Sequence, residues 1–237
     1  MRNSISVFIF CLALLCSLAS SFAPVPHRQQ KHHSPHSTLS AEAGDEAVDM
    51  GNVGFVLLAG GTGSRMKANM PKQYLPLKGV PVLHHSLDLF LNRLPNHCQE
   101  QGLEGPPHVV LVMDPTYQPE YQPIVDKYEG RLAFANPGVE RQGSVENGLS
   151  KLVEISSGKC EFVAVHDSAR PLVTIEEVTN VVKDAKEHGA AVLGVPCKAT
   201  IKESEDGAFV LRTIPRARLW EVSPFLVPSL LCACVRP

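Results

Sequence analysis

Short apolar segments alternate with longer amphipathic segments between residues 53 and 195, and this alternation restricts the fold more than any other feature of the chain. The first segment, VGFVLLA at residues 53–59, ends at Gly60-Gly61 and is typical of a parallel strand buried on both faces. We expect further strands at residues 109–113, 132–135, 162–165 and 191–195, and helices at 82–94, 144–153 and 175–187. Strands that alternate with helices predict an α/β fold, in which helices cover both faces of a mostly parallel sheet.

A second kind of element follows the last of these strands. Residues 200–202 and 209–212 flank an acidic turn, ESEDG at 203–207, whose Asp-Gly pair is a hairpin signal. We interpret this part as a β-arm that projects from the core.

Charge and cysteine content exclude some classes of protein. The formal net charge of -2 provides no basic field, so we expect no nucleic-acid partner. The 7 cysteines are scattered, and no Cys-x2-Cys pair recurs with histidine at zinc spacing. Free thiols in a reducing compartment are the simplest interpretation.

The N-terminal region is predicted to be a targeting sequence rather than part of the folded domain. The apolar run at residues 7–18 is shorter than a membrane span and is followed at once by small residues, which predicts a signal peptide at 1–21 and no membrane segment in the mature form. Residues 22–50 are then predicted to be a transit segment and to be disordered, because residues 22–40 contain basic and Ser residues but no acid. Such two-part leaders route proteins into plastids, here the chloroplast stroma, and plain secretion is the alternative.

Three loops that follow predicted strands contain the candidate binding and catalytic residues. The first begins at Ala59-Gly60-Gly61, continues through Gly63 and Arg65, and reaches Lys72. Its glycines allow backbone N–H groups to approach an anion. No Gly-Lys-Ser/Thr closes the loop, and the third glycine of a dinucleotide motif is missing, so a glycine loop with two cations remains, suited to a triphosphate.

The second and third loops follow other strand ends. GVERQGSV at residues 138–145 starts a helix, and by itself Ser144 reads as a helix-start residue. HDSARP at residues 166–171 places Asp167 at a strand end, where it can hold Mg²⁺ near phosphates. An internal ion pair between Asp167 and Arg170 is the alternative.

LAGGTGSRM, PKQYL and HDSARP together resemble the cytidylyltransferases that act on methylerythritol phosphate, within the sugar-phosphate nucleotidyltransferase superfamily. The resemblance implies a Rossmann-like nucleotidyltransferase fold, CTP and a sugar-alcohol phosphate as substrates, Mg²⁺ or another divalent cation as cofactor, and a homodimer formed through the arm. Val139 stands where bacterial members often place an acid, so one base contact must be made differently.

The resemblance also assigns roles to residues. The catalytic residues would be Arg65, Lys72 and Asp167, with Asp167 also the metal ligand. CTP would be bound by Ala59, Gly60, Gly61, Gly63, Gly138, Ser144 and Ser168, and Arg141 would support the second loop. The sugar-alcohol phosphate would be bound by Asp167, Arg170, Thr200 and Arg216, with Arg216 serving the site of the neighbouring subunit. His166 is expected to be structural.

The resemblance covers residues 53–222 almost continuously, and we predict a cytidylyltransferase domain at residues 51–222 that is incomplete. Residues 223–237 depart from the family pattern and are interrupted by Pro224, Pro228 and Pro237, so we expect an aberrant tail without a helix or strand. Two other functions stay open. One is a cytidylyltransferase for another polyol phosphate, such as ribitol 5-phosphate. The other is a non-catalytic truncated paralogue that binds nucleotide or dimerises with a full-length partner.

Overall fold

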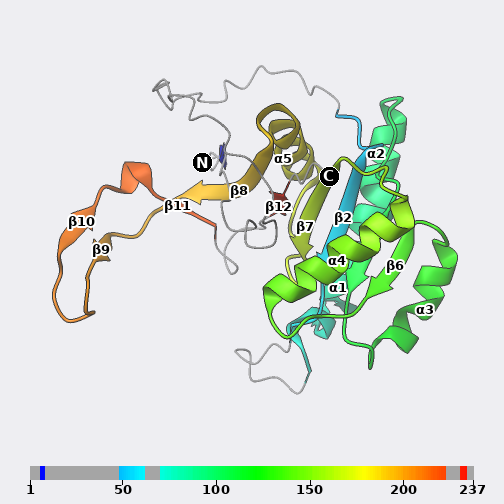
Figure 1. The fold of residues 1–237 in the computed structure, drawn as a ribbon, viewed down its shortest axis with the longest axis horizontal. Coiled ribbons are helices and arrows are strands. Elements are labelled where there is room, and N and C mark those ends of the chain that lie inside the picture. The colour runs from blue at the N-terminus through cyan, green and yellow to red at the C-terminus, as the bar shows by residue number, and fades with distance from the viewer. Residues whose placement is uncertain (1–5, 9–47, 62–69, 223–229, 234–237) are drawn as a thin grey trace, which may run out of the picture.

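The computed structural model describes residues 6–8, 48–61, 70–222 and 230–233. The core is one sheet with strand order β1-β8-β12-β7-β2-β5-β6 (Figure 1). In this order β1 is Ser6–Phe8, β8 is Ala190–Pro196 and β12 is Leu230–Ala233, and β11 (Trp220–Glu221) also pairs with β8. Four neighbouring strands are parallel to one another: β7 (Phe162–Asp167), β2 (Val53–Leu58), β5 (Val109–Val112) and, at one edge of the sheet, β6 (Leu132–Ala135). The predicted α/β fold is therefore confirmed.

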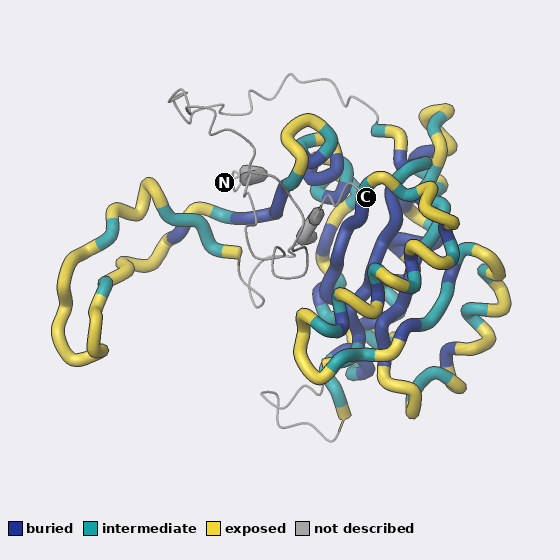
Figure 2. The backbone as a smooth tube through the Cα atoms, viewed as in Figure 1, coloured by how far each residue is buried: buried dark blue, intermediate teal, exposed yellow. Residues whose placement is uncertain are grey.

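The apolar composition of β2 divides the core into two layers. Phe55 and Leu57 face one apolar cluster, while Val56 and Leu58 face the other, because successive side chains of a strand point to opposite faces. Helix α4 (Arg141–Ser156) covers the second layer through Leu152. The first layer is covered by α5 (Ile175–His188) and by the helical residues 82–100, so helices lie on both faces, with the buried strands between them (Figure 2).

The helix expected at residues 82–94 is longer than predicted. It runs as α1 (Val82–Asp88), a π-helical segment (Leu89–Arg93) and α2 (Leu94–Glu100). Pro95 explains the π-helical segment, since a proline has no N–H for the carbonyl one turn earlier and its ring crowds that carbonyl. The apolar spacing stops near Leu94, which is why the sequence predicted an earlier end.

Helix α3 (Gln118–Lys127) was not predicted at all. It contains Pro119 and Pro123, and prolines usually argue against a helix. Pro119 lies in the first turn, where its missing N–H has no intrahelical partner to lose. Tyr121 anchors the helix in the core and is 1% exposed.

The predicted arm is present and projects from the sheet (Figure 1). It consists of β9 (Ile201–Glu203) and β10 (Arg212–Ile214), paired antiparallel, after β8 (Ala190–Pro196). The second strand starts three residues later than the predicted 209, because the side chain of Asp206 accepts hydrogen bonds from the N–H groups of Ala208 and Phe209 and so holds them in the loop. Two further strands, β3 (Pro76–Leu77) and β4 (Val80–Pro81), form a small hairpin before α1.

Two expectations about the chain ends differ from the structure. The tail was expected to contain no strand, which is wrong: Leu230–Ala233 form β12, antiparallel between β7 and β8. Pro224 and Pro228 precede this strand and therefore do not interrupt it, and an extended segment satisfies the backbone groups that β7 and β8 present. Residues 1–21 were placed outside the fold, yet Ser6–Phe8 form β1, paired with the other side of β8. Cleavage of the leader stays a prediction.

Candidate active site

The site lies where the strand order of the sheet reverses. Along the chain β2 is followed by β5 and β6 on one side, and the next parallel strand, β7, returns to the other side of β2. Leu58 and Asp167 are the last paired residues of β2 and β7, and the N–H of Ser168 donates to the carbonyl of Leu58 at 3.0 Å. The loops after β2 and β7 therefore leave the sheet side by side, at the crevice where open α/β sheets bind ligands.

A buried carboxylate surrounded by cations occupies this crevice. Oδ2 of Asp167 lies 3.6 Å from Nζ of Lys72, 3.7 Å from Nη1 of Arg141 and 3.7 Å from Nε of Arg170. Oδ1 accepts a hydrogen bond of 3.1 Å from the N–H of Ala169. Burial acts to raise the pKa of Asp167, but the charge of Lys72, the Ala169 hydrogen bond and the two guanidinium groups outweigh it, so the pKa is lowered. Asp167 is therefore ionised at neutral pH.

Three cations around one carboxylate leave an excess of positive charge. Arg170 is 8% exposed and stays charged although burial lowers its pKa. Lys72 and Arg141 are more exposed, at 32% and 63% of their side chains, and can turn toward a ligand. Together they make an anion site at the strand ends. Arg65 and Gly63 lie outside the described residues, so their predicted contribution stays a prediction.

Arg141 makes a contact that the sequence did not predict. The resemblance assigned it to support the second loop, which stays a prediction, and its guanidinium also reaches the carboxylate of Asp167 on the third loop. It is the first residue of α4, so the helix that crosses from β6 to β7 brings it to the crevice. The arginine itself was noticed in the sequence, but its partner is set by the crossover and not by the local pattern.

The glycine loop packs tightly against the second loop. A Cβ at Gly60 would lie 2.6 Å from Cβ of Pro137, so only glycine fits there without movement. The N–H of Ala59 donates to the carbonyl of Val112 at 2.7 Å, which continues the β2–β5 pairing to the start of the loop. Gly61 is exposed and has open space around it, so its backbone is accessible to a ligand.

Sequence reasoning missed Gln73. Its side-chain amide donates two hydrogen bonds, to the carbonyl of Ala59 at 2.6 Å and to the carbonyl of Gly61 at 2.9 Å. It lies in the short 3-10 turn Lys72–Tyr74 and is 2% exposed. The only local signal was a polar residue between Lys72 and the apolar residues that follow it.

The second loop is held by Ser144. Its hydroxyl donates to the carbonyl of Glu140 at 3.1 Å and accepts from the N–H of Gly138 at 3.0 Å. A Cβ at Gly138 would lie 2.5 Å from the carbonyl carbon of Gly143, a backbone atom that cannot easily move. Both predicted base-binding residues thus shape the loop, while Val139 points fully into solvent.

A buried polar layer lies beneath the third loop. Nε2 of His166 is 3.3 Å from the hydroxyl of Ser86 on α1, and this hydroxyl donates to the carbonyl of Ser168 at 3.2 Å. Complete burial lowers the pKa of His166 to about 4, so the ring is neutral and structural at neutral pH, as expected from the sequence. The side chain of Ser168 is also fully buried, so a direct contact between it and CTP would require the loop to rearrange.

The arm residues are not brought to this cluster within the chain. Thr200 and Arg216 lie at the base of the arm, which extends away from the sheet and is exposed along most of its length (Figure 2). Nη1 of Arg216 donates to the carbonyl of Lys198 at 3.0 Å. Their predicted contact with the sugar-alcohol phosphate therefore depends on a second copy of the chain.

The described residues fit a divalent cation only in part. They contain no group of three or more His, Cys, Asp or Glu side chains arranged to hold a metal. Asp167 is a single carboxylate, and Mg²⁺ in phosphate sites often takes one or two carboxylates and completes its shell with phosphate oxygens and water. The cluster therefore suits an ion that arrives with a triphosphate. Among the described helices, none has the length and apolar composition needed to cross a bilayer.

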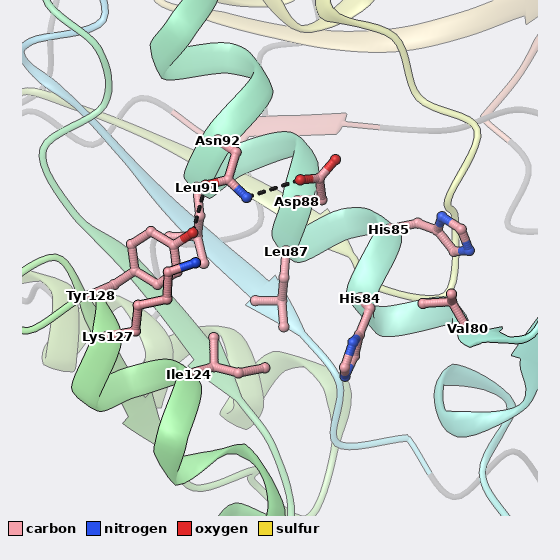
Figure 3. Close-up of a pocket in the computed structure, with 10 residues that line it drawn as sticks. All are labelled: Val80, His84, His85, Leu87, Asp88, Leu91, Asn92, Ile124, Lys127 and Tyr128. Atoms are coloured by element: carbon pink, nitrogen blue, oxygen red, sulfur yellow. Dashed lines mark hydrogen bonds between the residues drawn. The ribbon is translucent and has the colours of Figure 1, made fainter.

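A second hollow of about 390 Å³ lies between α1 and α3 (Figure 3). Leu87, Leu91 and Ile124 form its apolar part. At its rim Asn92 donates to Asp88 at 2.9 Å and the hydroxyl of Tyr128 donates to Asn92 at 2.5 Å. No side chain of the Asp167 cluster lines it.

Known proteins resemble this chain in both sequence and fold. A profile of the 2-C-methyl-D-erythritol 4-phosphate cytidylyltransferase family matches residues 53–235. The chloroplastic enzyme of that name from Oryza sativa subsp. japonica is 46% identical over 211 residues, which cover 88% of this chain and 66% of the rice protein. The enzyme from Geobacillus thermodenitrificans is 39% identical over 173 residues, 72% of this chain and 69% of its own. The chain thus spans about two thirds of the length of these relatives.

Solved structures agree on the fold. The crystal structure of 4-diphosphocytidyl-2C-methyl-D-erythritol synthase from Anaerococcus prevotii matches with a TM-score of 0.60 at 21% identity, over 77% of this chain and 72% of that one. A second structure of a synthase of that name matches with a TM-score of 0.53 at 23% identity, over 76% and 74% of the two chains. At these identities the likeness establishes the nucleotidyltransferase fold alone.

Proposed function

Because the chain belongs to the 2-C-methyl-D-erythritol 4-phosphate cytidylyltransferase family, we propose that it transfers the cytidylyl group of CTP to 2-C-methyl-D-erythritol 4-phosphate. The products are 4-diphosphocytidyl-2-C-methyl-D-erythritol and pyrophosphate, and the reaction serves the synthesis of isoprenoid precursors. The observation that carries the proposal is the cluster of Lys72, Arg141 and Arg170 around Asp167 at the ends of β2 and β7. It offers an anion site where this fold binds ligands.

The reaction needs positioning and charge stabilisation more than proton transfer. A phosphate oxygen of the acceptor attacks the α-phosphorus of CTP, and the bond to pyrophosphate breaks. The nucleophile is already an anion, so no general base is required. The site agrees with this, since the lowered pKa of Asp167 makes it a poor base and His166 is buried and neutral.

The cations then supply the catalysis. Negative charge moves toward the leaving pyrophosphate, and preorganised cations in a partly buried site stabilise that change. Lys72 is placed to act on the triphosphate, with Arg65 from the glycine loop as its proposed companion. Arg170 is the most buried of the three cations around Asp167 and is suited to orienting the acceptor phosphate.

Mg²⁺ is the proposed cofactor, with Asp167 as its protein ligand. When bound with the triphosphate it would neutralise part of the phosphate charge. The residues around Asp167 also hold this carboxylate in place without the ion, since it faces three cations and accepts the hydrogen bond of Ala169.

Selection of cytosine is proposed for the second loop. The hydroxyl of Ser144 already uses its hydrogen on Glu140 and one lone pair on Gly138, so it has only an acceptor left. An acceptor suits the amino group of cytosine and not the carbonyl that uracil has at the same position. The loop therefore favours CTP over UTP.

The arm is proposed to complete the site across a homodimer. The arm that carries Thr200 and Arg216 at its base extends away from the sheet (Figure 1), so these residues would need a second copy of the chain to reach an acceptor phosphate. The plastid is the proposed location, supported by the chloroplastic rice relative and by the composition of residues 1–50. No partner nucleic acid is expected.

Pyrophosphate release tests the function. Purified protein is assayed with each of CTP, UTP, ATP and GTP, together with 2-C-methyl-D-erythritol 4-phosphate and Mg²⁺. We expect turnover with CTP in clear preference to the others. Equal turnover with UTP would leave only a general nucleotidyltransferase. Turnover with ribitol 5-phosphate alone would favour the other polyol phosphate, and binding of CTP without turnover would favour a non-catalytic paralogue.

A further inference from the structure

We propose that Gln73 is a positioning residue that turns the backbone N–H of Gly60, at the start of the glycine loop, toward the triphosphate. The inference deepens the proposed function, on which it rests. Gln73 would touch neither nucleotide nor acceptor. It would act through the peptide units of the loop, to which its side-chain amide is bonded.

The contacts of Gln73 use its whole donor capacity. Nε2 carries two hydrogens, and they are donated to the carbonyls of Ala59 at 2.6 Å and Gly61 at 2.9 Å. Both partners are carbonyl oxygens, which can only accept, so the NH2 end of the amide must face them. The bond to Ala59 is buried and the bond to Gly61 is partly buried, so water is excluded more fully from the Ala59 carbonyl.

The geometry of the peptide unit explains how a hydrogen bond to a carbonyl also orients a backbone N–H. In a trans peptide unit the N–H points opposite to the C=O, and the described residues contain no cis peptide bond. The carbonyl of Ala59 and the N–H of Gly60 belong to one peptide unit, so the hydrogen bond from Gln73 to this carbonyl turns the N–H of Gly60 to the opposite side. Without Gln73 this peptide unit could turn over and present its carbonyl oxygen, which repels phosphate.

The turn that carries Gln73 is itself fixed in the core. The N–H of Tyr74 donates to the carbonyl of Pro71 at 3.0 Å, and the Tyr74 ring stacks on Tyr117 with centroids 4.1 Å apart. Lys72 belongs to the same turn and reaches Asp167. One short turn thus positions both the charge of Lys72 and the loop N–H that Gln73 orients. The two groups proposed to bind phosphate therefore keep a fixed position relative to each other.

A purely structural role for Gln73 predicts a different pattern of loss. Poor packing alone would lower the melting temperature and weaken every ligand to a similar extent. Loss of amide orientation would instead weaken a ligand in proportion to the phosphates it presents to the loop. Cytidine, CMP and CTP share one base and differ in phosphate number, so they separate the two cases.

The experiment measures binding of these three ligands to the full chain by calorimetry. Gln73→Met keeps the length and volume of the side chain but has no donor. We expect its affinity for CTP to fall about tenfold or more, as two lost hydrogen bonds imply, with a smaller fall for CMP and a change within about twofold for cytidine. Gln73→Asn keeps the amide but is too short to reach both carbonyls, so it should give the same order of effects and serves if the Met variant does not fold.

Val181→Ala is the matched control. Val181 is fully buried on α5, so its truncation destabilises the core without touching the loop. It should leave the ratio of CTP to cytidine affinity unchanged. If wild-type protein binds CTP and the Gln73 variants lose all three ligands equally, or none, the inference is overturned while the proposed function stands. No binding of CTP by the wild type would overturn both.

Discussion

The ammonium group of Lys72 lies 3.6 Å from the carboxylate of Asp167, although one belongs to the turn after β2 and the other to the end of β7. The pair joins two segments that meet only where the strand order reverses. It also keeps the lysine near the strand ends before any ligand arrives. A cation held in place beforehand needs little reorganisation when charge develops on a phosphate.

Replacing Lys72 by alanine should lower kcat far more than it raises KM for CTP. Charges that act in the transition state affect the rate constant, and loss of one such group costs about 3–4 kcal/mol, or roughly 10²–10³ in rate. Arg65→Ala is expected to behave in the same way. Steady-state kinetics with Lys151→Ala as control, whose lysine pairs with Glu154 on the surface of α4, provides the comparison. A raised KM with near-normal kcat would show that Lys72 is only a binding contact.

The Asp167→Asn variant should be less stable than the wild type at neutral pH, and the difference should shrink in acid. The folded-state pKa of Asp167 is lowered, so its stabilising contribution is present above the unfolded pKa of about 4 and is lost as the pH falls through the folded value. Urea unfolding of both proteins between pH 7 and pH 2.5 measures this. A difference that stays constant across this range would contradict the assigned environment of the carboxylate.

His166 should make the fold sensitive to mild acid. Its pKa is about 4 in the folded state and about 6.5 in the unfolded chain, so the unfolded state takes up the proton first and stability falls as the pH drops from 6.5 toward 4. Between pH 7 and pH 5 the loss attributable to this residue is about 2 kcal/mol. His166→Gln, which cannot titrate, should lose that much less over the same interval in urea unfolding. Parallel profiles for the two proteins would mean that the ring is accessible to protons.

Gly138→Ala should disrupt the second loop, whereas Gly143→Ala should not. A Cβ at Gly138 would meet backbone atoms at 2.5 to 2.8 Å, while a Cβ at Gly143 meets only Cα of Gly138 at 3.4 Å. We expect the first variant to raise KM for CTP at least tenfold, and the second to stay within about twofold because α4 tolerates alanine. Equal KM values for the two variants would remove the second loop from the nucleotide site.

Much of the fold could be predicted because the central strands are apolar without interruption. The strand at 132–135 has the predicted limits, and β2 and β7 differ from prediction by one and two residues at their ends. Helix α3 was not predicted because Pro119 and Pro123 lie within it, and prolines in a sequence usually argue against a helix. What stabilises α3 is the burial of Tyr121, which depends on elements distant in the sequence.

The sequence indicated several residues of the candidate site, but it did not indicate which of them contact one another. Sequence motifs after two strand ends indicated the candidate residues, namely the glycine loop, Lys72, Asp167 and Arg170. The convergence of Arg141 on Asp167 could not, since it depends on how α4 crosses the sheet. Gln73 gave no signal either, because a glutamine donates to whichever carbonyls the fold brings near it.

The pairing of β2 with β7, from Val53–Phe162 to Leu58–Asp167, lies in the middle of the sheet and ends at the site. Amide hydrogens in such central ladders exchange with solvent only when the whole domain opens, whereas an exposed arm exchanges through local opening. The part of the proposed acceptor site at the strand ends and the part on the arm are therefore expected to differ in how long they stay ordered. The phosphate-binding half would persist as long as the domain stays folded, while the half on the arm would be free to sample many positions until a second subunit fixes it.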